Sequence, residues 1–296
     1  MIGEDYVIDR LRLKNSANRW KFFAMLLLIG LVFLFIYRKG NIKQIGQDYI
    51  ASVSITGILI QNQEILESLY KIARKDNIKA IVVNINSPGG TAVGGESLYL
   101  AFKEIAKRKP IVSSIGELGT SAAYMAALGT DRIFAYGSSL TGSIGVMLQN
   151  IEVADLAKKY GVNLEVFKSS PLKGIPNHFE KLNDNQKGYV QDLINEAHQS
   201  FMKKVKEARK FSNDELEAID NGKVFIGIKA YKLKLIDQLG DKKDAIKWLR
   251  ENNEKIKGLK VNNVDLIKPT SKLDRLLDYS SNTLLFLTNL FSKALV

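Results

Sequence analysis

Two short stretches of the chain hold residues whose types and spacing suit covalent chemistry at a carbonyl group. Ser121 follows a β-branched run and precedes small apolar residues, so its hydroxyl is sterically open beside the free N–H groups of a helix start. Residues 86–90, NSPGG, follow another such run, and their two glycines let backbone N–H groups face a ligand. Taken alone, the serine also fits a helix N-cap, and the glycines fit an ordinary turn.

A third stretch, residues 167–176 (FKSSPLKGIP), places Lys173 among apolar and loop-forming residues. A lysine serves as a general base only when it is neutral, which requires its pKa to fall by about 3 units from about 10.4. In isolation, an ordinary solvated lysine is the simpler interpretation of Lys173.

Composition removes several other kinds of chemistry from the 296-residue, 33.1-kDa chain. It has no cysteine, which excludes disulfides, thiolate nucleophiles and cysteine-ligated metals. Its two histidines, His178 and His198, lie in polar surroundings and are expected at the surface. We therefore expect no metal and no cofactor.

The charge balance is strongly basic, with 43 Lys+Arg against 31 Asp+Glu and a net charge of +12. Such a balance fits a nucleic-acid partner or an anionic membrane surface. The basic residues are interspersed with acids and form no arginine-rich block, so we expect no nucleic-acid binding.

Residues 22–37 (FFAMLLLIGLVFLFIY) are uncharged and almost entirely apolar. At 1.5 Å a residue they extend about 24 Å, slightly less than the hydrocarbon core of a bilayer. Trp20 and Tyr37 lie where interfacial aromatics belong, and no small-residue cleavage pattern follows. We predict one transmembrane anchor at 22–37, rather than a signal peptide or a core helix.

Flanking charge predicts the orientation of this anchor. Residues 1–21 carry a modest excess of Lys and Arg over the residues after the span, which favours a cytoplasmic tail. Residues 38–48 would be a linker. The remaining chain would lie on the periplasmic or extracytoplasmic side of the inner (cytoplasmic) membrane.

The rest of the chain alternates strand-like and helix-like segments. Strands are expected at 49–60, 80–85, 111–115 and 132–136, with helices at 62–77, 92–107, 121–128 and 184–209. This rhythm, about 30 residues per unit, predicts an α/β fold with a parallel sheet flanked by helices.

In combination, these motifs resemble the signal peptide peptidase A (protease IV) family of membrane-anchored serine peptidases. The resemblance covers about 49–240. Residues 86–90 are similar to the family's N/D-S-P-G-G turn. Ser121 aligns with the serine of the family's A-S-G-G-Y-Y motif. Residues 141–147 (TGSIGVM) are similar to its T-G-S-I-G-V segment, and Lys173 falls at its lysine. Residues 222–240 (GKVFIGIKAYKLKLIDQLG) resemble its G-R-V-x-x-G…A…L-V-D-x-L-G segment.

The resemblance implies a Ser–Lys dyad, in which Lys173 accepts the proton of the nucleophile Ser121. The oxyanion would be bound by backbone N–H groups of Gly90 and of Ala122 or Ser121, with Gly89 and Ser143 in support. It also implies a ClpP/crotonase-like core of repeated β-β-α units over a peptidase domain at 49–250.

The resemblance further implies substrates and partners. Family substrates are signal peptide remnants and other hydrophobic peptides at the lipid bilayer, and single-copy members assemble as homo-oligomers, by analogy an octamer. The serine and the lysine of one dyad would come from the same chain or from two neighbouring chains. The extension 251–296 ends in an apolar tail, which would lie on the membrane, contact another subunit or pack on the domain itself.

Three departures from the family pattern keep other functions open. Ala122 and Ala123 replace two glycines, Gly174 replaces an aspartate, and Ser170 stands for a glycine. The added methyl groups leave every N–H donor in place, so we expect activity to persist. The alternatives are an inactive membrane scaffold of the same fold and a crotonase-like acyl-CoA enzyme.

Overall fold

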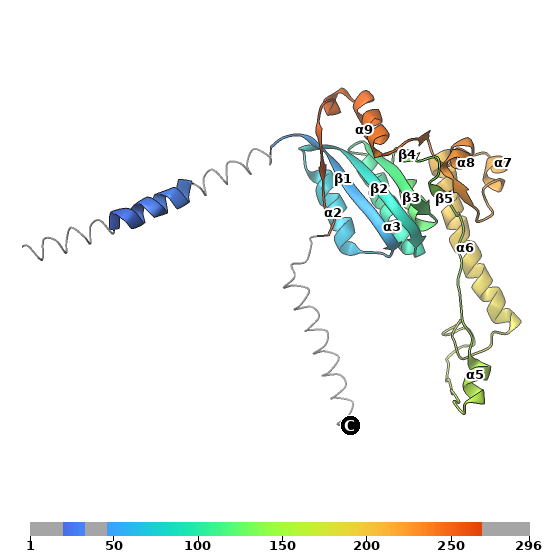
Figure 1. Cartoon of the computed structure of the whole chain (residues 1–296). Helices are drawn as coiled ribbons and strands as arrows, with labels where there is room; N and C mark the ends of the chain where they lie inside the picture. Colours follow the sequence, from blue (N-terminus) through green and yellow to red (C-terminus); the bar gives the residue numbers. More distant parts are fainter. Residues whose placement is uncertain (1–19, 33–45, 268–296) are drawn as a thin grey trace, which may run out of the picture. The chain divides into compact units, whose positions relative to one another are not determined.

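The computed structural model describes residues 20–32 and 46–267 (Figure 1). The chain divides into two compact units, 1–48 and 49–296, of which the second carries the sheet. The predicted apolar tail at 284–296 and most of the cytoplasmic tail at 1–21 lie outside the described residues.

The second unit alternates strands and helices, as the sequence predicts. Its strands are β1 (Tyr49–Leu59), β2 (Ile78–Gly90), β3 (Ile111–Thr120), β4 (Arg132–Ala135), β5 (Leu140–Gly142), β6 (Val224–Ile226), β7 (Gln238–Leu239) and β8 (Lys260–Asn263). Its helices are α2 (Gln63–Arg74), α3 (Ala92–Ala106), α4 (Ala122–Ala127), α5 (Ala154–Lys159), α6 (Asp184–Arg209), α7 (Asn213–Glu217), α8 (Gly227–Lys232), α9 (Lys242–Glu251) and the 3₁₀ helix η1 (Glu254–Ile256).

One sheet of eight strands organises the second unit. Its main path runs β6-β5-β3-β2-β1-β8, and β4 and β7 branch from β3. All neighbours are parallel except β5 and β6. The predicted α/β fold with a parallel sheet is therefore confirmed. Because β2 and β3 are adjacent and parallel, their carboxyl ends meet at one edge of the sheet.

Apolar side chains cover both faces of this sheet, which explains why its central strands read as nearly continuous apolar runs. The larger core joins one face to α2, α3, α4 and the carboxyl half of α6. The smaller core joins the other face to α9, through Ala245, Ile246 and Leu249. Figure 1 shows α2 and α3 lying along one side of β1 and β2.

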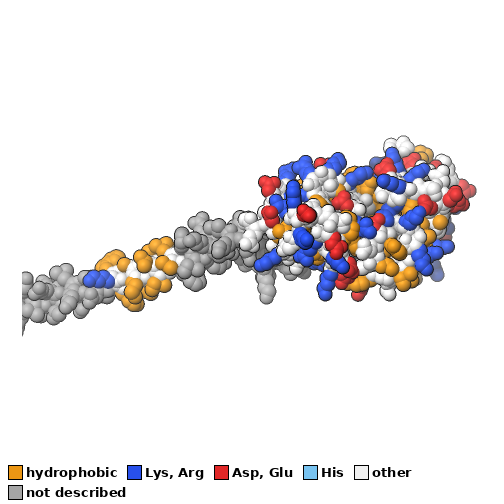
Figure 2. Space-filling view, turned by 90° about the horizontal axis from the view of Figure 1, so that it is seen from above, with side chains coloured by type: hydrophobic (Ala, Val, Ile, Leu, Met, Phe, Trp, Pro, Cys, Tyr) orange, Lys and Arg blue, Asp and Glu red, His pale blue; other side chains and the backbone are white. Residues whose placement is uncertain are grey.

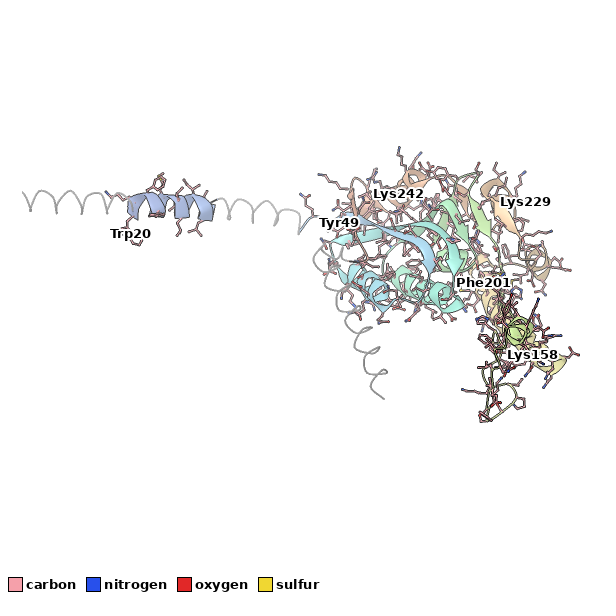
Figure 3. All side chains as sticks on the ribbon, turned by 60° about the horizontal axis from the view of Figure 1, so that its bottom comes forward. Trp20, Tyr49, Lys158, Phe201, Lys229 and Lys242 are labelled. Atoms are coloured by element: carbon pink, nitrogen blue, oxygen red, sulfur yellow. The ribbon has the colours of Figure 1, made fainter. Side chains whose placement is uncertain are left out.

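A long extension leaves the sheet between β5 and α6. We call residues 146–183 the arm; every one of them is described and none is buried. The arm includes α5 and lies at the amino end of α6, remote from the sheet (Figure 1). Phe201, on the carboxyl half of α6, is buried against the body, whereas Lys158 lies in the arm (Figure 3).

In the first unit, residues 20–32 form a helix with exposed apolar side chains, and Lys21 stands at its amino end (Figure 2). The other residues of the predicted anchor, 33–37, lie outside the described part. Among the described residues, no helix is both long and apolar enough to span a bilayer. On the visible face of the second unit, basic and acidic side chains are mixed (Figure 2).

One buried hydrogen bond connects α4 to the segment that follows α8. The Tyr124 hydroxyl donates to the Leu235 carbonyl at 2.7 Å, and Tyr124 is completely buried. Burial raises the pKa of Tyr124, which keeps it a neutral donor. Two residues further on, the Asp237 carboxylate accepts from the Ile133 N–H at 2.7 Å and from Arg209 at 2.9 Å. The 222–240 motif is therefore joined to α4 by a buried hydrogen bond, which helps to hold α4 in position.

Tyr124→Phe removes this donor and leaves the Leu235 carbonyl buried without it. We expect the free energy of unfolding to fall by about 1–3 kcal/mol. Urea denaturation followed by circular dichroism measures the loss. Tyr231→Phe, at a half-exposed tyrosine of α8, is the control and should leave the midpoint nearly unchanged.

Candidate active site

Ser121 lies at the junction of β3 and α4, in an unusual backbone conformation. Its φ is 54° and its ψ is −123°, a region that side-chain-bearing residues rarely occupy and that costs about 1–3 kcal/mol. Its N–H donates to the Gly142 carbonyl at 2.8 Å, and its carbonyl accepts from the Met125 N–H at 2.9 Å. Its side chain makes no capping hydrogen bond. Its hydroxyl thus does not act as a simple N-cap, and Ser121 is partly exposed to solvent.

The glycine turn that follows β2 packs directly against this serine. A Cβ added to Gly89 would lie 2.9 Å from the Cβ of Ser121 and 3.1 Å from the nitrogen of Ala122. The φ of Gly89 is +105°, which also favours glycine. The Thr120 hydroxyl donates to the Pro88 carbonyl at 3.0 Å and fixes the turn to the end of β3. Gly89 and Ser121 are therefore brought together, as the motifs led us to expect.

The backbone N–H groups around this turn differ in whether they already donate a hydrogen bond within the protein. The N–H of Gly89 donates to Ser87 Oγ at 3.1 Å, and that of Thr91 to the Leu59 carbonyl at 2.8 Å. The Ser121 N–H is engaged by Gly142. Among the described residues, no hydrogen bond outside helix α4 engages the N–H of Ala122, and the first residue of a helix has no partner within it. Gly90 is the last residue of β2 and pairs with Leu59 of β1. Of the two alternatives for the second oxyanion donor, Ala122 is thus better placed than Ser121.

The two alanines that replace the family's glycines point into the core. Ala122 is 3% exposed and Ala123 is fully buried. A Cβ on Gly95 of α3 would come within 2.8 Å of the Ala122 Cβ, so the missing side chain at Gly95 makes room for this methyl group. The Ala122 methyl group therefore fills space between α3 and α4, and both alanines are buried in the core.

Ser143 lies beside the same serine. It follows Gly142, has a φ of 51°, and donates its N–H to the Lys223 carbonyl at 2.8 Å. Its neighbour Gly142 holds the Ser121 N–H, so Ser143 is part of the same backbone arrangement.

Lys173, in contrast, lies in the arm. It is exposed, and its N–H donates to the Ser170 carbonyl within a turn. The preceding Pro171 carbonyl accepts from Gln186, in the first turn of α6. Along α6, Gln186 is about 22 Å from Phe201, which packs on the body. The structure therefore groups Ser121, Gly89, Gly90, Ala122 and Ser143, and places Lys173 of the same chain elsewhere.

The loop that carries Lys173 is closed by an ion pair at its base. Lys168 donates to the Glu180 carboxylate, which also accepts from the Asn177 side chain at 2.8 Å. These hydrogen bonds, that from Lys168 first, lower the pKa of Glu180. Throughout the described chain, the arm's hydrogen bonds and ion pairs join arm residues to one another or to the first turn of α6. Lys173 thus lies on a loop whose two ends are joined by the Lys168–Glu180 ion pair.

Sequence reasoning did not identify some residues that shape the site. Gly95 is one, although a glycine pair inside a helical pattern is a usable sign of close packing. Asn86 belongs to the 86–90 motif, but the sequence did not indicate its role: its side-chain oxygen accepts from the Leu118 N–H at 3.1 Å and joins the two strand ends. Among the described residues, no group of three or more His, Asp or Glu is placed to bind a metal.

Gly89→Ala should inactivate the site without unfolding the protein, because the new methyl group would collide with Ser121 and Ala122. We expect peptide hydrolysis to fall by about 100-fold or more, the size of effect seen when oxyanion donors are lost. Gly258→Ala is the matched control: its φ is +81°, but no atom lies within 4 Å of the added Cβ. Equal activity of the two variants would contradict the assigned role of Gly89.

Comparison with known proteins points to one family. The sequence profile described as peptidase family S49 matches residues 103–257. A provisionally named protease, slr0021, of Synechocystis sp. is 31% identical over 67% of this chain and 72% of its own length. Protease MJ0651 of Methanocaldococcus jannaschii, also provisionally named, is 35% identical over 62% of this chain and 59% of its own length.

A third relative, from Enterococcus faecium, has the provisional name signal peptide peptidase SppA. It is 29% identical over 65% of this chain, and the match spans 56% of its length. The matches thus span between 56% and 72% of the length of these three relatives, and their names are those of peptidases. They confirm the family expected from the motifs: the chain belongs to peptidase family S49.

Proposed function

We propose that this protein is a membrane-anchored serine endopeptidase in which Ser121 is the nucleophile and Lys173 is the general base. The observation that carries the proposal is the strained, partly exposed Ser121 directly beside the Gly89–Gly90 turn. A strained serine at a strand-to-helix junction is the arrangement that exposes a nucleophile to substrate in other hydrolases.

The chemistry proceeds through an acyl-enzyme. Neutral Lys173 Nζ accepts the proton of Ser121 Oγ, which forms a bond to the carbonyl carbon of the peptide. The N–H groups of Gly90 and Ala122 stabilise the oxyanion. The C–N bond then breaks as the lysine ammonium protonates the leaving amine, and water, deprotonated by the same lysine, releases the acyl group.

We propose that Lys173 reaches Ser121 of a second copy of this chain. The support is the position of Lys173 in the arm, whose polar contacts are made within the arm or with the first turn of α6. The arm also exposes apolar side chains that an isolated chain would leave in water, with Phe167 92% and Met147 81% exposed. An arm laid over a neighbouring subunit buries such side chains and brings a base to each serine. Subunit number, an octamer by family analogy, is part of this proposal.

Signal peptide remnants and similar hydrophobic peptides are the proposed substrates. An anchor at 22–37 would hold the site near the bilayer in which such peptides are left. We place residues 1–21 in the cytoplasm and the peptidase domain on the outer side of the inner membrane, on the basis of flanking charge. The name of the Enterococcus relative points to the same substrate class.

Single substitutions test the dyad. Full-length Ser121→Ala and Lys173→Ala should each lose at least about 1,000-fold in hydrolysis of a fluorogenic apolar peptide, because each removes one member of a unit. Lys158→Ala, at another exposed lysine of the arm, should retain full activity. Full activity of Lys173→Ala would reject Lys173 as the base, and no turnover by the wild type would favour an inactive scaffold.

Mixing the two inactive variants tests where the base comes from. After co-expression of Ser121→Ala and Lys173→Ala in equal amounts, about a quarter of the sites in a ring would combine an intact serine with an intact lysine from a neighbour. Activity should recover to about that fraction of wild type. Absence of recovery in co-purified hetero-oligomers would assign both residues to one chain.

The anchor is tested through the absence of cysteine in the natural chain. In intact cells, a membrane-impermeant maleimide should label Lys243→Cys in the second unit but label Ser16→Cys only after lysis. The reverse pattern would invert the proposed orientation, and labelling of both in intact cells would rule out a single-pass anchor.

A further inference from the structure

A pocket of about 360 Å³ lies beside β1, apart from the candidate active site. Strand β1, helices α2 and α3 and the residues after β8 form its walls. Most of its inward side chains are apolar, among them Ile55, Leu59, Ile65, Leu66, Leu98 and Leu266. Its size and apolar character suit a ligand with several apolar side chains.

The pocket continues into an unpaired edge of the sheet. β8 pairs with β1 only from Tyr49 to Ser52, and the last contact in this direction is the 2.9 Å bond from the Val264 N–H to the Ser52 carbonyl. Beyond Ser52, the described chain supplies a strand partner for β1 only on the β2 side. Ile58 and Ile60 are 74% and 63% exposed on this part of the chain. An open strand edge with exposed apolar side chains is a surface that proteins normally cover.

The described chain ends at the rim of this pocket. Residues 263–267 line it, and Ile267 is the last described residue of the second unit. Twenty-nine residues follow, and the most apolar stretch among them is 284–296, LLFLTNLFSKALV. The connection from Ile267 to Leu284 has sixteen intervening residues, which could span at most about 60 Å when fully extended. That distance allows the apolar segment to return to the pocket from which the chain departs.

We propose that the carboxyl-terminal segment 284–296 binds in this pocket, with its apolar side chains beside β1, α2 and α3. Tethering gives the segment an effective concentration on the order of millimolar at the pocket, which a free peptide rarely reaches. The same attachment favours the segment of the same chain over that of a second copy.

The pocket adjoins the candidate active site through Leu59. The Leu59 carbonyl accepts the Thr91 N–H at 2.8 Å, and a Cβ on Gly90 would lie 2.0 Å from that carbonyl oxygen. A segment packed on Leu59 would therefore support the Gly89–Gly90 turn from the side opposite Ser121.

Disulfide trapping in the full chain tests this proposal. Ser97→Cys places a thiol in the pocket wall, and Leu284→Cys, Leu287→Cys, Leu290→Cys or Phe291→Cys places one in the segment. The Ser121→Ala background prevents self-cleavage, so the readout does not depend on peptidase activity. We expect at least one pair to form an intrachain disulfide in membranes at least tenfold faster than the same segment cysteine with Lys243→Cys, an exposed site on α9 across the sheet.

Three results would overturn the proposal. One is cross-linking at control rates for all four segment positions. Another is a covalent dimer when chains with Ser97→Cys alone are mixed with chains with Leu290→Cys alone, because the segment would then occupy a second copy. The third is quenching of a fluorophore on Leu290→Cys by brominated lipids together with no intrachain disulfide, which would place the segment on the bilayer.

Discussion

The side-by-side ending of two parallel strands is the constraint on which the candidate site depends. β2 ends in the Gly89–Gly90 turn, and Ser121 follows β3 at the same edge of the sheet. The contact between Gly89 and Ser121 leaves no room for a side chain at position 89. Ser121 keeps its left-handed backbone because Gly142 holds its N–H and Met125 its carbonyl. The sheet thus fixes the positions of Ser121 and of the proposed oxyanion donors before any substrate arrives, which would preorganise the site electrostatically if they have the proposed roles.

Much of this arrangement was predictable from the sequence, for physical reasons. Buried parallel strands have nearly continuous apolar sequences, and an amphipathic helix shows a periodicity of about 3.6 residues. For these reasons the predicted bounds of β1 and of the helix at Asp184–Arg209 lie close to the observed ones. The family resemblance implied that the Gly89–Gly90 turn and Ser121 share one site, and the adjacent parallel strands β2 and β3 explain why they meet. β2 and β3 extend further than their apolar cores, because pairing continues through the turn residues, where no hydrophobic pattern marks it.

Other features were beyond sequence reasoning because they depend on three-dimensional proximity. The sequence does not show where the methyl groups of Ala122 and Ala123 lie, whereas the structure shows both residues buried and Ala122 packed against Gly95. The choice of Ala122 over Ser121 as a donor needed the hydrogen bond to Gly142. The position of Lys173 was equally unpredictable, since nothing in residues 167–176 indicates that they belong to an arm.

The separation of Ser121 from Lys173 within one chain has a consequence for how the protein matures. If Lys173 serves the Ser121 of a second copy, as proposed, a newly made subunit would carry the serine without its proton acceptor. It would then remain inactive through synthesis and through the proposed insertion in the membrane. Catalytic competence would then rise with at least the square of subunit concentration, and dilution in the bilayer would switch it off without any inhibitor or propeptide. On this proposal, the arm would determine when the enzyme becomes active.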